Sequence, residues 1–313
     1  MNSLVVIEDN RGKVHRMSKE AIVGAQKLGG DVFALVIGEN ASSLSSDLSS
    51  LQLTQILVFE DDLVSTYNAD GYSEVVSQIV KSMNINIIIA GHTYQTRDYM
   101  PRVSAKLDIP FIPDIIGIDQ DLYIKQVLNA KLNSSISCST SSRILSFQSA
   151  CFSEDDIITG TAEIKNIEVN LDSSLVRSTS EEPFQDSTSE VDLESSELIV
   201  SVGRGIEKEE NISIAFDLAK VLNAEVSASR PVVDAGWMPS FRQVGSSGST
   251  VAPKLYFSLG VSGAIQHVVG MKGSKTILAI NKDRDAPIFE IADYAVIGDV
   301  LEIIPKLTEV LSE

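Results

Sequence analysis

The chain has 313 residues, of which 43% are hydrophobic and 22% charged, a composition that suits about two globular domains rather than a disordered chain. It carries 43 acidic and 25 basic residues, so its formal net charge is -18. Because an acidic surface repels phosphates, this balance argues against non-specific binding to nucleic acid or to an anionic membrane.

The negative charge is unevenly distributed. Residues 1–196 hold 28 acidic and 14 basic residues, whereas residues 197–313 hold 15 and 11, so the second part is better suited to an anionic ligand. The two cysteines match no disulfide framework or metal motif. The chain begins with a strand-like segment, and its apolar runs are too short to cross a bilayer, so we expect a cytoplasmic protein without membrane insertion.

The first part of the chain alternates short apolar runs with segments of helical spacing. The predicted strands are Leu4–Glu8, Val32–Ile37, Ile56–Phe59 and Ile85–Ala90, and the predicted helices are Ser18–Leu28, Tyr72–Met83 and Arg97–Leu107. This alternation indicates a parallel, doubly wound sheet. The N-terminal α/β domain is predicted to span residues 1–171. It includes short serine-rich strands within 122–169 that are either antiparallel or an extension of the sheet.

Residues 172–196 are dense in serine, threonine and acidic side chains, a composition typical of a solvated linker. The C-terminal domain, residues 197–313, returns to an α/β rhythm. Its predicted strands are Leu198–Val202, Glu225–Ser229, Leu255–Leu259 and Thr276–Ile280, and its predicted helices are Asn211–Leu222, one that starts at Ala264, and Leu301–Leu311. The fold class is therefore α/β, with two domains that each contain a mostly parallel, doubly wound sheet.

Glycine and polar residues recur where the strands of the C-terminal domain end. The four segments are Gly203–Gly205, Ser229–Arg230, Gly260–Gly263 and Asn281–Asp283. Ligands of open parallel sheets bind outside the carboxyl ends of the strands, where glycines let backbone N–H groups approach a phosphate and a helix N-terminus adds a positive dipole. A single tight turn of this kind is weak evidence. Four of them together favour a nucleotide site.

Several other types of site find no support in the sequence. The dinucleotide pattern GxGxxG followed by an acidic residue is absent, and so is the phosphate-binding pattern GxxxxGK[ST]. The three histidines, His15, His92 and His267, are scattered and form no cluster with metal-ligand spacing. No serine or cysteine lies in a nucleophile elbow. A hydrolase or a metalloenzyme is therefore not favoured.

The C-terminal domain resembles the electron-transfer flavoprotein alpha subunit family. The matching runs are Ser229–Pro239, Gln243–Gly248, Val251–Tyr256, Gly260–His267, Gly270–Lys272, Ala279–Asp283, Ala286–Phe289, Ala292–Tyr294 and Gly298–Asp299. In the N-terminal domain the resemblance is looser and lies mainly in Arg102–Asp114. The resemblance implies an FAD bound by the C-terminal domain and a heterodimer with a beta subunit. It also implies that the N-terminal domain mostly packs against that subunit rather than binding a ligand at Gly91–Thr93.

The resemblance also implies roles for individual residues of the FAD site. Arg204, Ser229 and the turn Ser262, Gly263, Ala264 and Ile265 are similar to the family's pyrophosphate contacts. Val244, Gly245, Ser246 and Ser247 match the loop along the isoalloxazine ring, and Arg230 matches the cation beside it. Gln266 and His267 match residues near the ribityl chain and the pyrimidine edge. Asn281, Asp299 and Val300 match the adenosine end.

Elementary chemistry agrees with three of these roles. A cation such as Arg230 stabilises a reduced, anionic flavin. At about 4 Å and an effective dielectric constant near 20 the stabilisation is about 4 kcal/mol, or roughly 170 mV for one electron. His267 as a donor to the pyrimidine carbonyl would offset the same charge. Ser247 stands where family members commonly have threonine, and either hydroxyl can bond flavin N5.

The resemblance implies an electron carrier rather than an enzyme with its own small-molecule substrate. Its FAD would take electrons from a donor dehydrogenase, such as an acyl-CoA dehydrogenase of fatty acid beta-oxidation. It would pass them to a quinone reductase or another acceptor oxidoreductase. Two alternatives stay open: a flavin-dependent oxidoreductase that acts on a small substrate, and a non-catalytic nucleotide-binding sensor. Electron bifurcation by the complex also stays open, because a second flavin or nucleotide would belong to the beta subunit.

Overall fold

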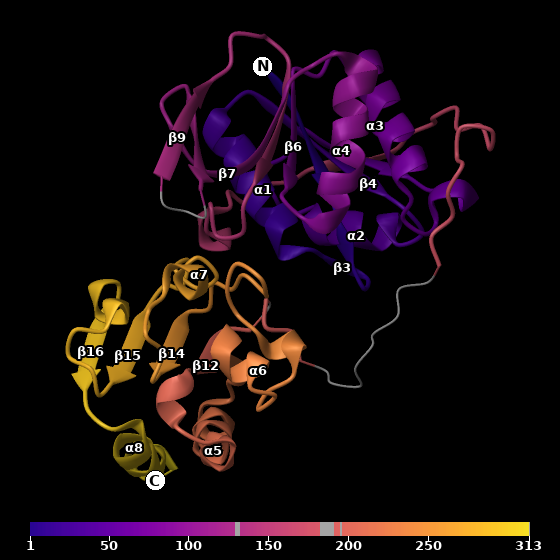
Figure 1. Ribbon diagram of the computed structural model, residues 1–313. Helices are drawn as coiled ribbons and strands as arrows, with labels where there is room; N and C mark the ends of the chain where they lie inside the picture. The colour runs from indigo at the N-terminus through magenta and orange to yellow at the C-terminus, as the bar shows by residue number, and fades with distance from the viewer. Residues whose placement is uncertain (129–131, 182–190, 195, 313) are drawn as a thin grey trace. The chain divides into compact units, whose positions relative to one another are not determined.

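The structure is a computed structural model that describes residues 1–128, 132–181, 191–194 and 196–312 (Figure 1). The described residues divide into two compact units. The first contains residues 1–127 and 132–181, and the second contains Leu128, residues 191–194 and residues 196–312. The predicted linker, 172–196, lies partly outside the described residues. Its described part is not uniformly solvated, because Leu193 is only 3% exposed and packs into the core of the C-terminal unit.

The N-terminal unit is built on a nine-stranded sheet with the order β11-β5-β4-β1-β6-β10-β7-β8-β9. The strands are β1 (Asn2–Ile7), β4 (Asp31–Ile37), β5 (Gln55–Phe59), β6 (Ile87–Gly91), β7 (Phe111–Asp119), β8 (Leu122–Val127), β9 (Leu132–Ser137), β10 (Arg143–Phe147) and β11 (Glu163–Asn166). Every neighbouring pair is parallel except β7–β8 and β8–β9. A separate short hairpin joins β2 (Asp9–Asn10) to β3 (Lys13–Val14).

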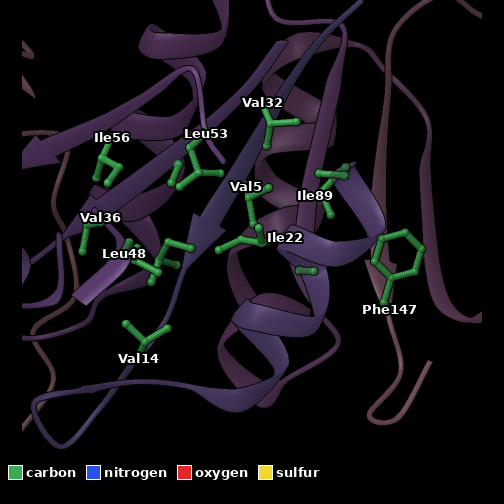
Figure 2. Close-up of a cluster of buried hydrophobic side chains, with 14 of the residues drawn as sticks. Val5, Val14, Ile22, Val32, Val36, Leu48, Leu53, Ile56, Ile89 and Phe147 are labelled. Atoms are coloured by element: carbon green, nitrogen blue, oxygen red, sulfur yellow. The ribbon is translucent and has the colours of Figure 1, made fainter. Parts of the chain in front are cut away.

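Two pairs of helices bury the apolar strand residues of this sheet. Helices α1 (Arg16–Leu28) and α2 (Ala41–Leu48) contribute to one core cluster, and α3 (Ala69–Met83) and α4 (Tyr94–Leu107) contribute to a second. Figure 2 shows the first cluster, in which Val5 and Ile89 of the sheet lie near Ile22 of α1. Helix residues with apolar spacing thus pack on a sheet that is buried on both faces, as parallel sheets require.

Helix α2, strand β7 and the hairpin of β2 and β3 were not predicted. Helix α2 has the sequence ASSLSSDL, and its four serines lower its intrinsic helix propensity. It forms because Leu44 and Leu48, one turn apart, are each only 1% exposed. Strand β7 contains Pro113 and Gly117, which are unfavourable inside a strand. The two alternatives for the serine-rich region are both present, because β8 and β9 are antiparallel while β10 and β11 extend the parallel sheet.

The C-terminal unit contains a five-stranded, fully parallel sheet with the order β13-β12-β14-β15-β16. The strands are β12 (Leu198–Val202), β13 (Glu225–Ala228), β14 (Leu255–Leu259), β15 (Ile277–Asn281) and β16 (Tyr294–Ile297). The helices are α5 (Ser213–Leu222), α6 (Arg230–Asp234), α7 (Ile265–Val268) and α8 (Val300–Ser312). Both units therefore confirm the predicted α/β fold with mostly parallel sheets.

The two faces of the C-terminal sheet are covered differently. Helices α5 and α8 lie side by side on one face (Figure 1), where Leu218 and Ile304 are fully buried. On the other face Tyr256 of β14 packs with Val251 and Met271 from the loops that flank the strands. The strand order reverses between β12 and β14. The connections leave their carboxyl ends in opposite directions, and a ligand crevice forms at such a point.

Candidate cofactor site

A cavity of about 810 Å³ lies at the carboxyl ends of β12, β13, β14 and β15 in the C-terminal unit. Its volume falls within the roughly 300–1,000 Å³ range of small-molecule sites. The residues that line it are Arg204, Gly205, Ser229, Arg230, Pro231, Val244, Gly245, Ser247, Gly260, Val261, Ser262, Ala264, Gln266, His267, Asn281, Asp283, Ala286 and Pro287. The four strand-end segments that stand out in the sequence thus converge on one cavity.

Most of the predicted site residues line this cavity. The five that do not are Ser246, Gly263, Ile265, Asp299 and Val300. Sequence reasoning missed seven lining residues as site residues: Gly205, Pro231, Gly260, Val261, Asp283, Ala286 and Pro287. Gly205, Gly260, Val261 and Asp283 carried a usable signal, because they belong to the strand-end segments. Pro287 belongs to the run Ala286–Phe289 of the family resemblance, and it reaches the cavity through a 3₁₀ turn (Pro287–Glu290) after β15.

Two glycines allow the ends of β12 and β14 to approach each other closely. A Cβ added to Gly205 would lie 2.6 Å from the Cα of Gly260, which no real Cβ tolerates. The Gly205 N–H donates to the Gly260 carbonyl over 3.0 Å, and Gly260 itself has a φ of 63°, a conformation that favours glycine. The close approach therefore keeps backbone, rather than side chains, at this wall of the cavity.

The turn after β14 presents unbonded N–H groups. The amides of Ser262, Gly263 and Ala264 donate to no acceptor in the described part of the chain. The Asn281 side-chain amide holds the turn by donating to the Val261 carbonyl over 2.9 Å. The predicted helix from Ala264 is a single turn, α7, so its dipole adds little. An anion here would be bound mainly by the free amides.

The loop between α6 and β14 is closed by its own backbone. The Ser249 N–H donates to the Gln243 carbonyl over 2.8 Å, and the Gly245 N–H donates to the Ser249 carbonyl over 3.1 Å. The Ser246 N–H donates to the Gln266 carbonyl over 2.7 Å, which ties the loop to α7. This closure fixes the backbone from which Ser247 faces the cavity.

The two arginines at the cavity differ in their surroundings. Arg204 makes no ion pair with any described residue. Arg230 lies 66% exposed, and its Nε donates to a carboxylate oxygen of Asp234 one turn along α6, over 3.3 Å. Because water and a carboxylate both weaken its field, Arg230 is a weaker electrostatic group than the sequence estimate assumed.

His267 faces inward. The residue is 6% exposed, its Nε2 is 2.9 Å from the Tyr256 hydroxyl, and its buried Nδ1 lies near the Val244 backbone without a well-formed hydrogen bond. Burial lowers the pKa of His267 to about 4, which the contact with the Val244 backbone opposes weakly. In this geometry His267 is a neutral imidazole that lines the cavity and whose Nε2 is engaged with the Tyr256 hydroxyl.

The carboxylate of Asp299 forms an ion pair with Lys282. It accepts a hydrogen bond from Lys282 at 2.9 Å and another from the Leu301 N–H at the start of α8. These donors lower the pKa of Asp299, and the carboxylates of Glu207 and Asp299 raise the pKa of Lys282 to about 12. The carboxylate thus links Lys282 to the start of α8, which is consistent with its position outside the cavity lining.

Both halves of the chain match domains of one family of known proteins. Residues 3–172 match the model of the electron transfer flavoprotein domain, and residues 192–272 match the electron transfer flavoprotein FAD-binding domain. The electron transfer flavoprotein subunit alpha of Thermoanaerobacterium thermosaccharolyticum is 36% identical over 97% of this chain and 96% of its own. The chain belongs to the electron transfer flavoprotein alpha subunit family.

Further relatives extend this family membership. The electron transfer flavoprotein subunit alpha of Bacillus subtilis is 34% identical over 98% of this chain and 96% of its own. A protein of Caenorhabditis elegans named probable electron transfer flavoprotein subunit alpha, mitochondrial, is 35% identical over 99% of this chain and 93% of its own. Within the described part of the chain, the family member studied here has no helix long and apolar enough to cross a bilayer.

FAD is the cofactor of this flavoprotein domain, and the cavity has the chemistry to hold it. The amides of the turn 262–264 suit a pyrophosphate, and the guanidinium of Arg204, which makes no ion pair with any described residue, adds positive charge. Gly205 and Gly260 give a backbone wall without side chains, and Val244 supplies an apolar surface for a ring. The residues present therefore fit a dinucleotide whose two phosphates carry negative charge.

Proposed function

We propose that this chain is the alpha subunit of a heterodimeric electron transfer flavoprotein and works as an electron carrier with a beta subunit. A dehydrogenase, such as an acyl-CoA dehydrogenase, would supply electrons to the bound FAD, and a quinone reductase or another acceptor oxidoreductase would take them. Family membership supports the carrier role, and the donor and acceptor are inferred from the same resemblance.

One observation carries the choice of a carrier over an enzyme with its own substrate: the cavity offers no group suited to general acid–base catalysis. His267 is neutral, and its Nε2 is engaged with the buried Tyr256 hydroxyl. The carboxylate of Asp283, the one acidic residue in the lining, accepts a hydrogen bond from the Asp285 N–H within its own turn. Electron transfer needs neither a proton acceptor nor a nucleophile, because it requires only contact between the flavin and its partners.

The residues of the cavity divide into three roles. The bound FAD supplies the redox chemistry. Arg204 and the amides of Ser262 and Ala264 bind the pyrophosphate, and Asn281 holds that turn through the Val261 carbonyl. The 244–247 loop would lie along the isoalloxazine, where the Ser247 hydroxyl would face N5 and Arg230 would lie beside the ring. Neutral His267 lines the cavity beside Val244, with its Nε2 at the Tyr256 hydroxyl.

Absorption spectroscopy of the purified complex tests this proposal. The chain is co-expressed with its beta subunit, supplied with FAD and titrated with a donor dehydrogenase and its substrate. We expect a yellow protein that is reduced only when the dehydrogenase is present and that reoxidises with an acceptor flavoprotein. Direct reduction by a small substrate without the dehydrogenase would indicate a substrate-reducing enzyme. A complex that stays colourless in excess FAD would refute the carrier role.

A further inference from the structure

The side chain of Gln243 lies directly behind Ser247. Its Nε2 donates to the Ser247 Oγ over 2.9 Å, across the base of the closed loop. Gln243 is only 8% exposed and does not line the cavity, whereas Ser247 is exposed and does line it. The amide is therefore held in the protein while the hydroxyl that it contacts faces the ligand space.

The backbone fixes this arrangement from both sides. The Gln243 carbonyl accepts from the Ser249 N–H over 2.8 Å, and the Gln243 N–H donates to the Ser240 carbonyl over 3.0 Å. A Cβ on Gly248 would collide with the Gln243 carbonyl, so the chain returns past Gln243 as closely as a glycine permits. The closed backbone of the loop thus sets the distance between the Gln243 amide and the Ser247 hydroxyl.

The direction of this hydrogen bond decides what Ser247 can do. A serine hydroxyl has one hydrogen to donate and two lone pairs to accept with. Because the Gln243 amide uses one lone pair, the hydroxyl hydrogen stays free, and acceptance of a hydrogen bond makes that hydroxyl a better donor. The free hydrogen can then donate toward the cavity that Ser247 lines.

We propose that Gln243 is a positioning residue that makes Ser247 a hydrogen-bond donor to flavin N5. The proposal rests on the proposed placement of Ser247 beside the isoalloxazine. An unprotonated N5 accepts a hydrogen bond, whereas a protonated N5 donates one. A directed donor therefore favours the flavin forms in which N5 is unprotonated, and Gln243 tunes the spacing between the two one-electron potentials without touching the cofactor.

Substitution of Gln243 by glutamate reverses the hydrogen bond with almost no change of shape. A carboxylate only accepts, so Ser247 must donate to it and loses its donor function toward the cavity. The measurements on the FAD-loaded complex are the ¹⁵N chemical shift of flavin N5 and the two reduction potentials, expressed as a disproportionation constant. The variants are Gln243→Glu, Gln243→Met, Ser247→Ala and the double variant that combines Gln243→Met with Ser247→Ala. Ser249→Ala, a serine of the same loop outside the cavity lining, serves as the matched control.

We expect Gln243→Glu and Ser247→Ala each to change the disproportionation constant about tenfold, equivalent to about 59 mV in the separation of the potentials. Both should shift the N5 resonance in the same direction. In the Ser247→Ala background the neutral change Gln243→Met should have little further effect, because the residue acts through the hydroxyl, whereas Gln243→Glu would also act through its charge. Ser249→Ala should match the wild type.

Three results would overturn parts of this reasoning in distinguishable ways. If Ser247→Ala changes the N5 chemical shift and the disproportionation constant but Gln243→Glu changes neither, the positioning role of Gln243 alone is refuted. An unshifted Ser247→Ala variant would refute the placement of Ser247 at N5. If Gln243→Glu loses FAD, the neutral Gln243→Met variant replaces it. Loss of FAD from both variants, with retention in Ser247→Ala, would mean that Gln243 supports the loop and not the hydroxyl.

Discussion

Acid should destabilise the C-terminal unit through His267. The imidazole is buried, its Nε2 contacts the Tyr256 hydroxyl at 2.9 Å, and burial lowers its pKa to about 4. Protonation would place a positive charge in a buried position beside the buried Tyr256. No charged side chain of the described residues contributes to the pKa shift of His267, so none offsets that charge. The perturbation is therefore a fall in pH, compared between the wild type and His267→Gln.

The magnitude follows from the two pKa values. An unfolded histidine titrates near 6.5 and the folded one near 4, a difference of about 2.5 units, or about 3 kcal/mol at 1.36 kcal/mol per unit. Because the folded-state pKa is depressed, the unfolded chain binds the proton first as the pH falls. The contribution of neutral His267 is fully present above pH 6.5 and is lost progressively as the pH falls toward 4.

Two assays measure this effect. The chain has 3 histidines, so ¹³C-histidine NMR of the complex with an unlabelled beta subunit gives few signals, and His267→Gln identifies the one of interest. That signal should stay unprotonated down to about pH 5. In urea unfolding, the wild type should lose about 2 kcal/mol more than His267→Gln between pH 7 and 4.5. A signal that titrates at or above pH 6.5, or equal losses in both proteins, would contradict the argument.

Two further predictions concern the cavity walls. Arg230→Ala should lower the flavin potential in a reductive titration by only about 40 mV. An exposed cation acting through water contributes about 1 kcal/mol, and Asp234 already offsets part of its field. Lys220→Ala on α5 should leave the potential unchanged, and a shift near 170 mV for Arg230→Ala would mean that the arginine is buried in the complex. Gly205→Ala should abolish FAD binding in an absorbance titration, because its Cβ would lie 2.6 Å from Gly260 Cα. Retention of tight binding would mean that the two strand ends can separate.

The strand ends of the C-terminal unit show how far local sequence patterns reach. Apolar runs that stop at glycine or at a polar residue predicted β12, β13, β14 and β15 to within about a residue, because burial on both faces of a parallel sheet selects such runs directly. The carboxyl ends of parallel strands meet at one edge, so the same pattern also predicted that Arg204, Ser229, Ser262 and Asn281 would line one cavity.

Other features depend on partners distant in the sequence. Helix α2 forms from a serine-rich segment because Leu44 and Leu48 find a core to enter. Strand β10 lies between β6 and β7, an arrangement that no local pattern specifies. The exposure of Arg230 and the burial of His267 against Tyr256 likewise depend on what surrounds each side chain.

The sequence by itself therefore determined the α/β class of both halves, the acidic character of the chain and the strand-end segments that gather at one site. Those features follow from local periodicity and from residue types, which a linear chain carries directly. Only the tertiary structure decided which polar groups face the cavity, which are neutralised by neighbours and which side chain supports another. Gln243 shows the difference, since its importance to Ser247 comes entirely from the closure of the loop between them.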